Sequence, residues 1–370
     1  MPTANADAFG RRKEDLETPA LCLDLERYQR NAARLAAFLK QHGVSWRPHM
    51  KGQKAPRLAQ MAVAAGAIGV TCATVYEAEA MAAAGIASIL IAHETVGAAK
   101  LRRLARLEHK TCVISATDSA EHLHMLADAA RAERVIIPVI VELDVGMHRS
   151  GIQPGEPAVQ LARLAASTEG IRLEGLMGWE GHVTQLQGAE KTRAAQQSLA
   201  ALVETARLFR EHGLSAEIVS CAGSGTFLES AQVTGITEAQ AGGAVFSDLT
   251  YQSWGVDHEF ALTVLARVAS RPAPDRIIVD AGFKAMSTDH GLPLILELDG
   301  VKRLALSAEH ATIVLNSPSP NPRVGDLVEF VPSYTDSTVC LHDEMVALRK
   351  GVVEEVWEIP GRSGGRGLRL

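Results

Sequence analysis

The sequence has no excess of basic residues. It contains 37 Lys and Arg residues against 43 Asp and Glu residues, which gives a formal net charge of -6 at pH 7. A nucleic-acid-binding surface needs clustered, surplus Lys and Arg residues, so we expect no nucleic-acid partner. A small-molecule substrate fits this charge balance better.

Cysteine is scarce, and no two cysteines stand at the CxxC spacing of a zinc or redox motif. Each of the five lies singly inside an apolar segment; they are Cys22, Cys72, Cys112, Cys221 and Cys340. Buried free thiols explain this pattern better than disulfides or a zinc cluster do. We therefore expect a reducing compartment, the cytoplasm.

Segments that would direct the chain to a membrane are also missing. Residues 1–17, MPTANADAFGRRKEDLE, lack the apolar core of a signal peptide. Residues 58–76 carry no charge, but Gly66, Gly69 and many alanines make this stretch a poor membrane span. It is better interpreted as a helix that runs into a buried strand, so we expect no membrane association.

The sequence does contain a repeated alternation of short apolar runs and amphipathic helical segments, from about residue 20 to residue 250. The runs are LCLDL, VSWRPHM, AIGVTCAT, SILIAH, TCVISA, IIPVIVELDV, LEGLMGW and EIVSCAG. About eight consecutive βα units favour a closed parallel barrel, because a doubly wound sheet of this size would usually show a central topological switch. The predicted fold class is therefore α/β, with a (β/α)8 barrel.

A different texture follows residue 255. Short strands such as ALTVLARVAS, RIIVDAG, DLVEFVPS and VVEEVWEI are joined by Pro, Gly and Asp turns, without long helices. This pattern indicates a β-rich domain. We predict a barrel domain over residues 20–255 and a C-terminal β-rich domain over residues 256–370, the latter joined by residues 1–19.

The segment RPHMKGQK, residues 47–54, places a lysine where a barrel carries its chemistry. The strand VSWRPHM would deliver Lys51 to the C-terminal end of the barrel, where active sites form. A partly desolvated lysine can form a Schiff base with an aldehyde, which is how pyridoxal 5'-phosphate is held. The motif by itself favours the simpler interpretation, a solvated lysine at a strand end.

Two glycine-rich segments downstream are candidates for a phosphate site. They are SCAGSGTF, residues 220–227, and EAQAGGAVF, residues 238–246. Small residues let backbone N–H groups approach a phosphate, and barrels often bind phosphate after strands seven and eight. Either segment alone is a weak signal, but together with Lys51 they predict a pyridoxal phosphate site.

Six motifs in order resemble one enzyme family, the D-threonine aldolases and D-serine dehydratases. The motifs are TPALCLDL (18–25), RPHMKGQK (47–54), GMHRSG (146–151), SCAGSGT (220–226), VDAGFKAMSTDHGLP (279–293) and GDLVEFVPSYTDSTVCLHD (325–343). The family consists of pyridoxal phosphate enzymes of fold type III, with an alanine-racemase-like barrel and a C-terminal β-domain. The resemblance spans residues 17 to 360.

The resemblance implies roles for individual residues. Lys51 matches the Schiff-base lysine, and Arg149 matches an arginine near the phenolic oxygen of the cofactor or near the substrate. The residues that match the phosphate cradle are Ser224, Gly225, Thr226, Gly242 and Gly243. These residues are expected to bind the cofactor.

The sequence departs from the family pattern at the metal site. Relatives hold a divalent metal through a His that is followed by an Asp or a Cys, whereas here Tyr334 takes the place of the His and Asp336 keeps the carboxylate. Oxygen ligands suit Mg²⁺ or Mn²⁺, so the resemblance implies a weak site for one of these ions at Asp336. His342 and Asp343 are further candidates, or are ordinary strand-end residues.

The segment GWEGH departs from the pattern as well. Trp179 stands where many relatives have a tyrosine, and we expect it beside the cofactor; Gln185 lies near the place of a catalytic histidine. His182 is the nearest substitute. It is suited to stack on the cofactor ring, to bind the metal, or to accept the proton of a substrate hydroxyl; it is alternatively an ordinary loop histidine.

The predicted function is that of a pyridoxal-phosphate-dependent lyase in D-amino acid metabolism. A D-threonine aldolase-like enzyme would cleave β-hydroxy-D-amino acids to glycine and an aldehyde. The alternatives are a dehydratase of D-serine or related β-hydroxy-D-amino acids, a racemase that uses Lys51 and Tyr334, and a non-catalytic carrier of the cofactor. A homodimer is expected, because relatives complete each barrel mouth with the β-domain of the partner.

Overall fold

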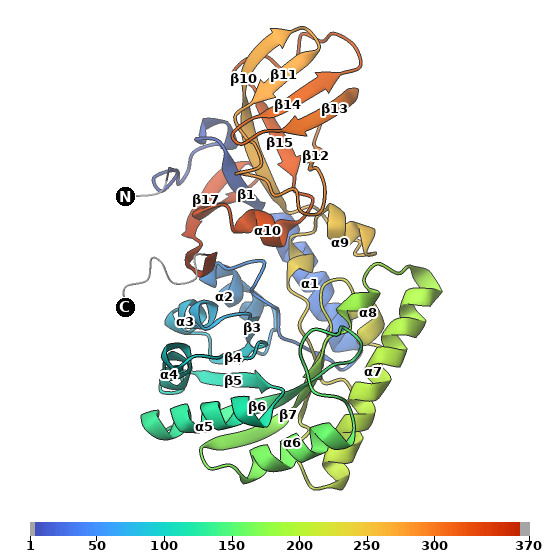
Figure 1. Ribbon diagram of the computed structural model, residues 1–370. Coiled ribbons are helices and arrows are strands. Elements are labelled where there is room, and N and C mark those ends of the chain that lie inside the picture. The colour runs from blue at the N-terminus through green and yellow to red at the C-terminus, as the bar shows by residue number, and fades with distance from the viewer. Residues whose placement is uncertain (1–3, 363–370) are drawn as a thin grey trace. The chain divides into compact units, whose positions relative to one another are not determined.

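The structure is a computed structural model that describes residues 4–362. Contacts between residues divide this part of the chain into two compact units. The barrel unit is Ala33–Gly242, and the sheet unit consists of residues 4–32 and 243–362. The division of the chain falls inside helix α1 (Leu25–Gln41), labelled in Figure 1, whose residues up to Ala32 belong to the sheet unit and whose later residues belong to the barrel unit.

The barrel unit contains a sheet of eight strands whose neighbours all pair in parallel. The strands are β2 (Ser45–Trp46), β3 (Val70–Cys72), β4 (Ser88–Ile91), β5 (Cys112–Thr117), β6 (Ile137–Leu143), β7 (Ile171–Gly178), β8 (Ile218–Cys221) and β9 (Glu238–Ala239). They follow the order β2-β9-β8-β7-β6-β5-β4-β3. A parallel bridge between His49 and Thr71 joins the chain after β2 to β3 and closes the ring. The predicted fold class is confirmed.

Helices follow most of these strands. They are α2 (Pro56–Ala64), α3 (Val75–Ala83), α4 (Ala98–Leu107), α5 (Ala120–Glu133), α6 (Glu156–Ser167), α7 (Gly188–Glu211) and α8 (Phe227–Ser230), with a 3-10 turn η2 (Gly181–Val183). Local sequence sets their starts: Thr74 accepts a hydrogen bond from the Glu77 N–H at 3.2 Å, and Pro56 opens α2. Within residues 4–362 no helix is long and apolar enough to cross a membrane.

Apolar side chains from neighbouring strands fill the interior of the barrel. The cluster consists of Leu90, Ile114, Ala116, Ile140 and Met177. Side chains of a strand alternate between its two faces, so residues that follow these positions by two point to the same interior. The strand ends therefore direct polar side chains to the C-terminal mouth of the barrel.

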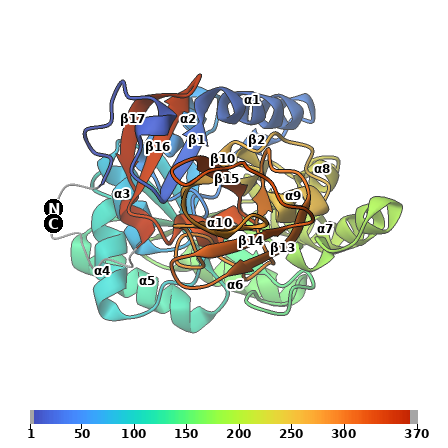
Figure 2. The same ribbon diagram turned by 90° about the horizontal axis from the view of Figure 1, so that it is seen from above.

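The sheet unit contains nine strands, most of which pair antiparallel. They are β1 (Ala20–Asp24), β10 (Leu262–Ala273), β11 (Arg276–Val279), β12 (Leu294–Ile295), β13 (Val301–Leu306), β14 (Ala311–Leu315), β15 (Leu327–Val331), β16 (Glu344–Arg349) and β17 (Val352–Glu358). The order is β13-β14-β11-β10-β1-β16-β17, and β15 pairs with β10 and β12 (Figure 2). Short helices complete the unit: η1 (Lys13–Asp15), η3 (Gly243–Val245), α9 (Leu249–Ser253), α10 (Thr335–Val339) and η4 (Pro360–Arg362).

The run LCLDL differs from its expected place among the barrel strands. As β1 it pairs antiparallel with β10 and parallel with β16, and Cys22 is buried beside Leu265 and Val346. A short apolar run can pair in either sheet, and only these long-range partners decide which one it joins. The assignment of residues 20–255 and 256–370 to two functional domains stays a prediction.

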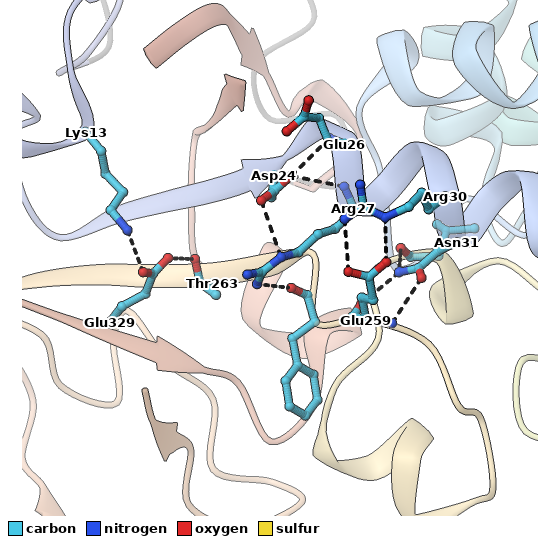
Figure 3. Close-up of polar contacts among 11 residues, drawn as sticks. Lys13, Asp24, Glu26, Arg27, Arg30, Asn31, Glu259, Thr263 and Glu329 are labelled. Atoms are coloured by element: carbon cyan, nitrogen blue, oxygen red, sulfur yellow. Dashed lines mark hydrogen bonds and ion pairs between the residues drawn. The ribbon is translucent and has the colours of Figure 1, made fainter. Parts of the chain in front are cut away.

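Polar contacts hold the N-terminal segment within the sheet unit (Figure 3). Lys13 Nζ lies 2.6 Å from Glu329 Oε2, and Arg30 Nε lies 2.7 Å from Glu259 Oε1. The side-chain amide of Asn31 donates to the backbone carbonyl of Glu259 at 2.7 Å. Because several partners are more than two hundred residues away, neighbouring sequence alone does not reveal this arrangement.

Candidate active site

Lys51 follows the short strand β2 at the mouth of the barrel. Its backbone N–H donates to His49 Nδ1 at 3.3 Å, and its side chain is half-buried. The Met50 N–H donates to the Thr71 carbonyl at 2.7 Å, which holds this segment against β3. Lys51 therefore lies beyond the end of a barrel strand, as the sequence predicts.

Trp179, directly after β7, lies close to three parts of the predicted site: Lys51, Arg149 and the glycine-rich segment after β8. Lys51 Nζ lies 5.5 Å from the centroid of its ring, and Arg149 Cζ lies 5.0 Å from it. On the cradle side, a Cβ atom added to Gly223 would lie 2.9 Å from the Trp179 Nε1 atom. Two cations at these distances interact favourably with the electron-rich face of the indole.

The charges that act on His49 at the mouth are positive. Burial lowers the pKa of His49 well below its ordinary value, and the nearby charges of Lys51, Lys54 and Arg149 lower it further. The imidazole is therefore neutral at pH 7. Lys54 is neutralised by an ion pair with Glu77 at 2.5 Å, which leaves Lys51 and Arg149 as the cations closest to Trp179.

The first part of the predicted phosphate cradle follows β8. Ala222 adopts a left-handed backbone conformation with φ of 65°, which turns the chain sharply at the strand end. Thr226 Oγ1 donates to the fully buried Glu180 at 2.5 Å, and Ser230 Oγ donates to the same oxygen at 2.6 Å. The Thr226 hydroxyl is therefore engaged in holding the turn.

The second part of the cradle follows β9. The Gly242 N–H donates to Ser224 Oγ at 3.2 Å, which joins the two glycine-rich segments. A Cβ atom on Gly242 would lie 2.1 Å from the His49 carbonyl oxygen, so no larger residue fits there without a backbone shift. Gly243 begins the sheet unit, where a Cβ atom would meet Tyr251 Oη at 2.1 Å. A small-residue cradle near a half-buried lysine fits pyridoxal phosphate.

His182 lies on η2, at the edge of this group. A Cβ atom on Gly146 would lie 2.8 Å from its Cε1 atom, and its Nε2 atom lies 3.2 Å from Ser198 Oγ on α7. The ring is exposed to solvent. Its predicted role as a proton acceptor stays a prediction.

Tyr334 and Asp336 belong to the sheet unit, where they form a cluster with Tyr251. Asp336 accepts a hydrogen bond from Tyr251 Oη at 2.8 Å on one oxygen and from Tyr334 Oη at 3.2 Å on the other. The Tyr334 ring stacks on His290 with 4.2 Å between centroids. Burial raises the pKa of Tyr334 above its ordinary value, and the adjacent Asp336 raises it further, so the phenol keeps its proton.

These side chains, as they lie, do not fit a metal ion. Both Asp336 oxygens already accept phenol hydrogen bonds, and residues 4–362 contain no group of three or more His, Cys, Asp or Glu side chains that could hold one. His342 Nε2 lies 2.8 Å from the Ala285 carbonyl oxygen, and Asp343 pairs with Arg362. No step of the reaction is therefore derived through a metal.

Two acidic residues at the mouth were not among the predicted site residues. Glu142 lies near the end of β6 and is 4% exposed, and its pKa is raised to about 8, chiefly by burial and also by Glu94. Arg149 lowers the pKa of Glu142 and so lies close enough to act on it. A glutamate inside the apolar run IIPVIVELDV was the available sequence signal, because strand alternation directs it inward with Ile140.

Comparisons with known proteins identify the family. Residues 23–249 match the model of the alanine racemase N-terminal domain, and residues 261–348 match that of a serine dehydratase domain. A D-threonine aldolase of an Arthrobacter species is 35% identical over 95% of this chain and 94% of its own length. The cofactor of this family is pyridoxal phosphate, and the predicted assignment to its enzymes is confirmed.

Solved structures agree. A D-threonine aldolase from Filomicrobium marinum has a TM-score of 0.92 and 34% identity, over 98% of this chain and 99% of that one. A D-threo-3-hydroxyaspartate dehydratase from Delftia sp. HT23 has a TM-score of 0.83 and 30% identity, over 94% and 98% of the two chains. The chain therefore belongs to the family of D-threonine aldolases and related D-amino acid dehydratases with an alanine-racemase-like barrel, as the sequence motifs predict.

Proposed function

We propose that this protein is a pyridoxal-phosphate-dependent lyase that cleaves β-hydroxy-D-amino acids to glycine and an aldehyde. The observation that carries the proposal is the group formed by Lys51, Trp179 and Arg149 beside a glycine cradle, in a chain 35% identical to a D-threonine aldolase. The charge of Lys51 and Arg149 suits an anionic amino acid and a phosphate.

Each residue of this group has a distinct task in the proposal. When bound, pyridoxal phosphate supplies an electron sink for the electron pair of the breaking Cα–Cβ bond. Lys51 holds the cofactor through its amine and, once displaced by the substrate amine, moves a proton at the substrate α-carbon. Arg149 binds an oxygen of the cofactor or the substrate carboxylate, and the Trp179 ring holds both cations at the mouth.

The cradle residues and His182 complete the proposal. Ser224 and Gly225 bind the phosphate through backbone N–H groups and the Ser224 hydroxyl. Gly242 holds Ser224 in place by donating its N–H to that hydroxyl oxygen, and Thr226 stabilises the turn through Glu180. His182 accepts the β-hydroxyl proton as cleavage begins. Its hydrogen bond to Ser198 would orient the ring for that transfer.

Dehydration is the second candidate. Its support is the match of residues 261–348 to a serine dehydratase domain and the similarity to a hydroxyaspartate dehydratase. In that reaction Lys51 removes the α-proton, and the β-hydroxyl takes up a proton and leaves as water. A racemase that uses Tyr334 as the second base gains no support from the raised pKa of that phenol, which makes it a poor base at neutral pH.

A divalent ion at Asp336, Mg²⁺ or Mn²⁺, stays a prediction. It would require the phenols of Tyr251 and Tyr334 to leave the carboxylate.

We also propose that the protein is a homodimer in the cytoplasm. An active, monodisperse monomer in light scattering would contradict the dimer.

Product analysis tests the proposed reaction. The holoenzyme is incubated with D-threonine, D-serine and their L-isomers, and glycine, ammonia and enantiomer ratio are measured. Formation of glycine and an aldehyde from D-threonine, but not from L-threonine, supports the aldolase. Ammonia without glycine identifies the dehydratase, and a change of enantiomer ratio without cleavage identifies a racemase.

A further inference from the structure

Two carboxyl groups, one after β4 and one near the end of β6, meet at the barrel mouth across the end of the strand between them, β5. Glu142 follows the core residue Ile140 by two positions on β6, so it points into the barrel. Glu94 follows β4 and continues the row formed by Leu90 and Ala92, both of which pack in the barrel interior. The two side chains lie within hydrogen-bonding reach of each other.

The hydrogen bonds of this pair are incomplete unless a proton lies between them. Ser150 Oγ donates to Glu142 Oε1 at 2.8 Å. The other Glu142 oxygen and Glu94 Oε1 are buried, and no donor from residues 4–362 meets either of them. Two ionised carboxylates would repel each other and remain unsatisfied, whereas one shared proton satisfies both oxygens.

The surrounding charges favour one proton on the pair. Arg149 acts on Glu142 from the loop after β6, and His122 on α5 lies near Glu94. The His122 ring lies 3.1 Å from Thr117 Oγ1 and 2.9 Å from the Thr95 carbonyl oxygen, and burial lowers its pKa, so it is neutral at pH 7.

Other acids at the strand ends are already engaged. Asp118, after β5, accepts from the Gly151 N–H at 3.1 Å. Glu180, after β7, accepts from Thr226, and Asp144, on the loop after β6, accepts from the His148 N–H at 2.9 Å. His93 is a further titratable neighbour, which acts on His122. Arg149 is the cation that acts on Glu142.

We propose that Glu94 and Glu142 share one proton and form a positioning pair for Arg149. With one proton the pair carries a single negative charge, which holds the guanidinium at the mouth, where it lies over Trp179. A second negative charge, gained when the proton leaves, would draw Arg149 away from that ring. The pair thus makes the position of Arg149 depend on pH. This inference rests on the proposed function only in its assumption that Arg149 faces the cofactor or substrate.

Thermal unfolding of the holoenzyme between pH 5 and pH 8.5 tests the shared proton. A folded-state carboxyl that keeps its proton to higher pH stabilises most at low pH, and this stability is lost as the pH rises to about 8. We expect Glu142→Gln and Glu94→Gln each to reduce the loss of melting temperature across this range by about 3 °C. The double variant should show no further reduction, because one proton is removed only once.

The control for the unfolding experiment is an exposed carboxyl on α5. Glu121→Gln changes an exposed carboxyl on α5 and should leave the pH profile of unfolding unchanged. Profiles identical to wild type in both single variants, or effects that add in the double variant, would overturn the shared proton.

Chemical modification tests the positioning of Arg149. Phenylglyoxal reacts with arginine, and a nearby negative charge that favours the protonated guanidinium slows this reaction. The double variant Glu94→Gln/Glu142→Gln removes the single negative charge and should raise the modification rate of Arg149 severalfold, as measured by mass spectrometry, whereas each single variant keeps one carboxylate and should leave the rate near that of the wild type. An unchanged rate in the double variant would overturn the positioning role. Neither experiment requires turnover, so the inference and the proposed function fail separately.

Discussion

Gly242 approaches His49 so closely that a Cβ atom would lie 2.1 Å from the His49 carbonyl oxygen. Backbone on both sides leaves no flexible group to move. We expect Gly242→Ala to displace the cradle and weaken pyridoxal phosphate binding at least about tenfold, which corresponds to roughly 1.4 kcal/mol. Equilibrium titration of the apoenzyme with the cofactor measures this effect.

The control for this variant is Gly213→Ala. A Cβ atom there meets nothing within 4 Å, although φ is 70°. It should cost about 1 kcal/mol of stability through backbone strain and leave cofactor affinity unchanged. Equal affinity loss in both variants would contradict the role of the close approach.

The second prediction concerns Lys51. Borohydride reduction of the yellow holoenzyme should fix the cofactor on this residue, because its amine is half-buried at the mouth and lies 5.5 Å from the Trp179 ring. Peptide mass spectrometry locates the label. Lys51→Ala should lose it, whereas the exposed control Lys100→Ala should keep it. A label on another lysine would refute the assignment.

The third prediction follows from the lowered pKa of His49. The unfolded chain binds a proton at this histidine near pH 6.5, while the folded protein resists doing so, so stability should fall as the pH falls below 6.5. His49→Gln should reduce the loss of melting temperature between pH 7.5 and pH 5.5. His109→Gln, on the surface, serves as the control. The same loss in wild type and His49→Gln would contradict this account.

The fourth prediction concerns metal removal. Because Tyr251 and Tyr334 occupy the Asp336 oxygens, we expect less than one equivalent of Mn²⁺ per chain after dialysis. Tyr334→His should raise Mn²⁺ affinity about tenfold or more in calorimetric titration, since an imidazole adds a ligand beside the carboxylate. Tyr334→Phe is the control without a new ligand. If the wild-type enzyme keeps its full turnover in excess chelator, the reaction does not require a metal ion.

The local sequence was sufficient for the barrel and for much of the candidate site. Apolar runs with helical segments between them identify parallel strands, because each strand and helix leaves its own period in the chain. Lys51 and the two glycine-rich segments stand directly after such strands, and a strand end in a barrel faces the mouth whatever the distant sequence is. These predictions depend on neighbouring residues only.

Tertiary structure alone decided the rest. Cys22 and its strand pair with β10 and β16, whose residues lie more than two hundred positions away, and nothing in LCLDL distinguishes them from barrel partners. Glu94 and Glu142 meet because the barrel directs the ends of β4 and β6 to the same mouth, and Asp336 accepts a hydrogen bond from the phenol of Tyr251, 85 positions earlier. Proton sharing and hydrogen bonding act over a few ångströms in space, so sequence separation does not reveal them.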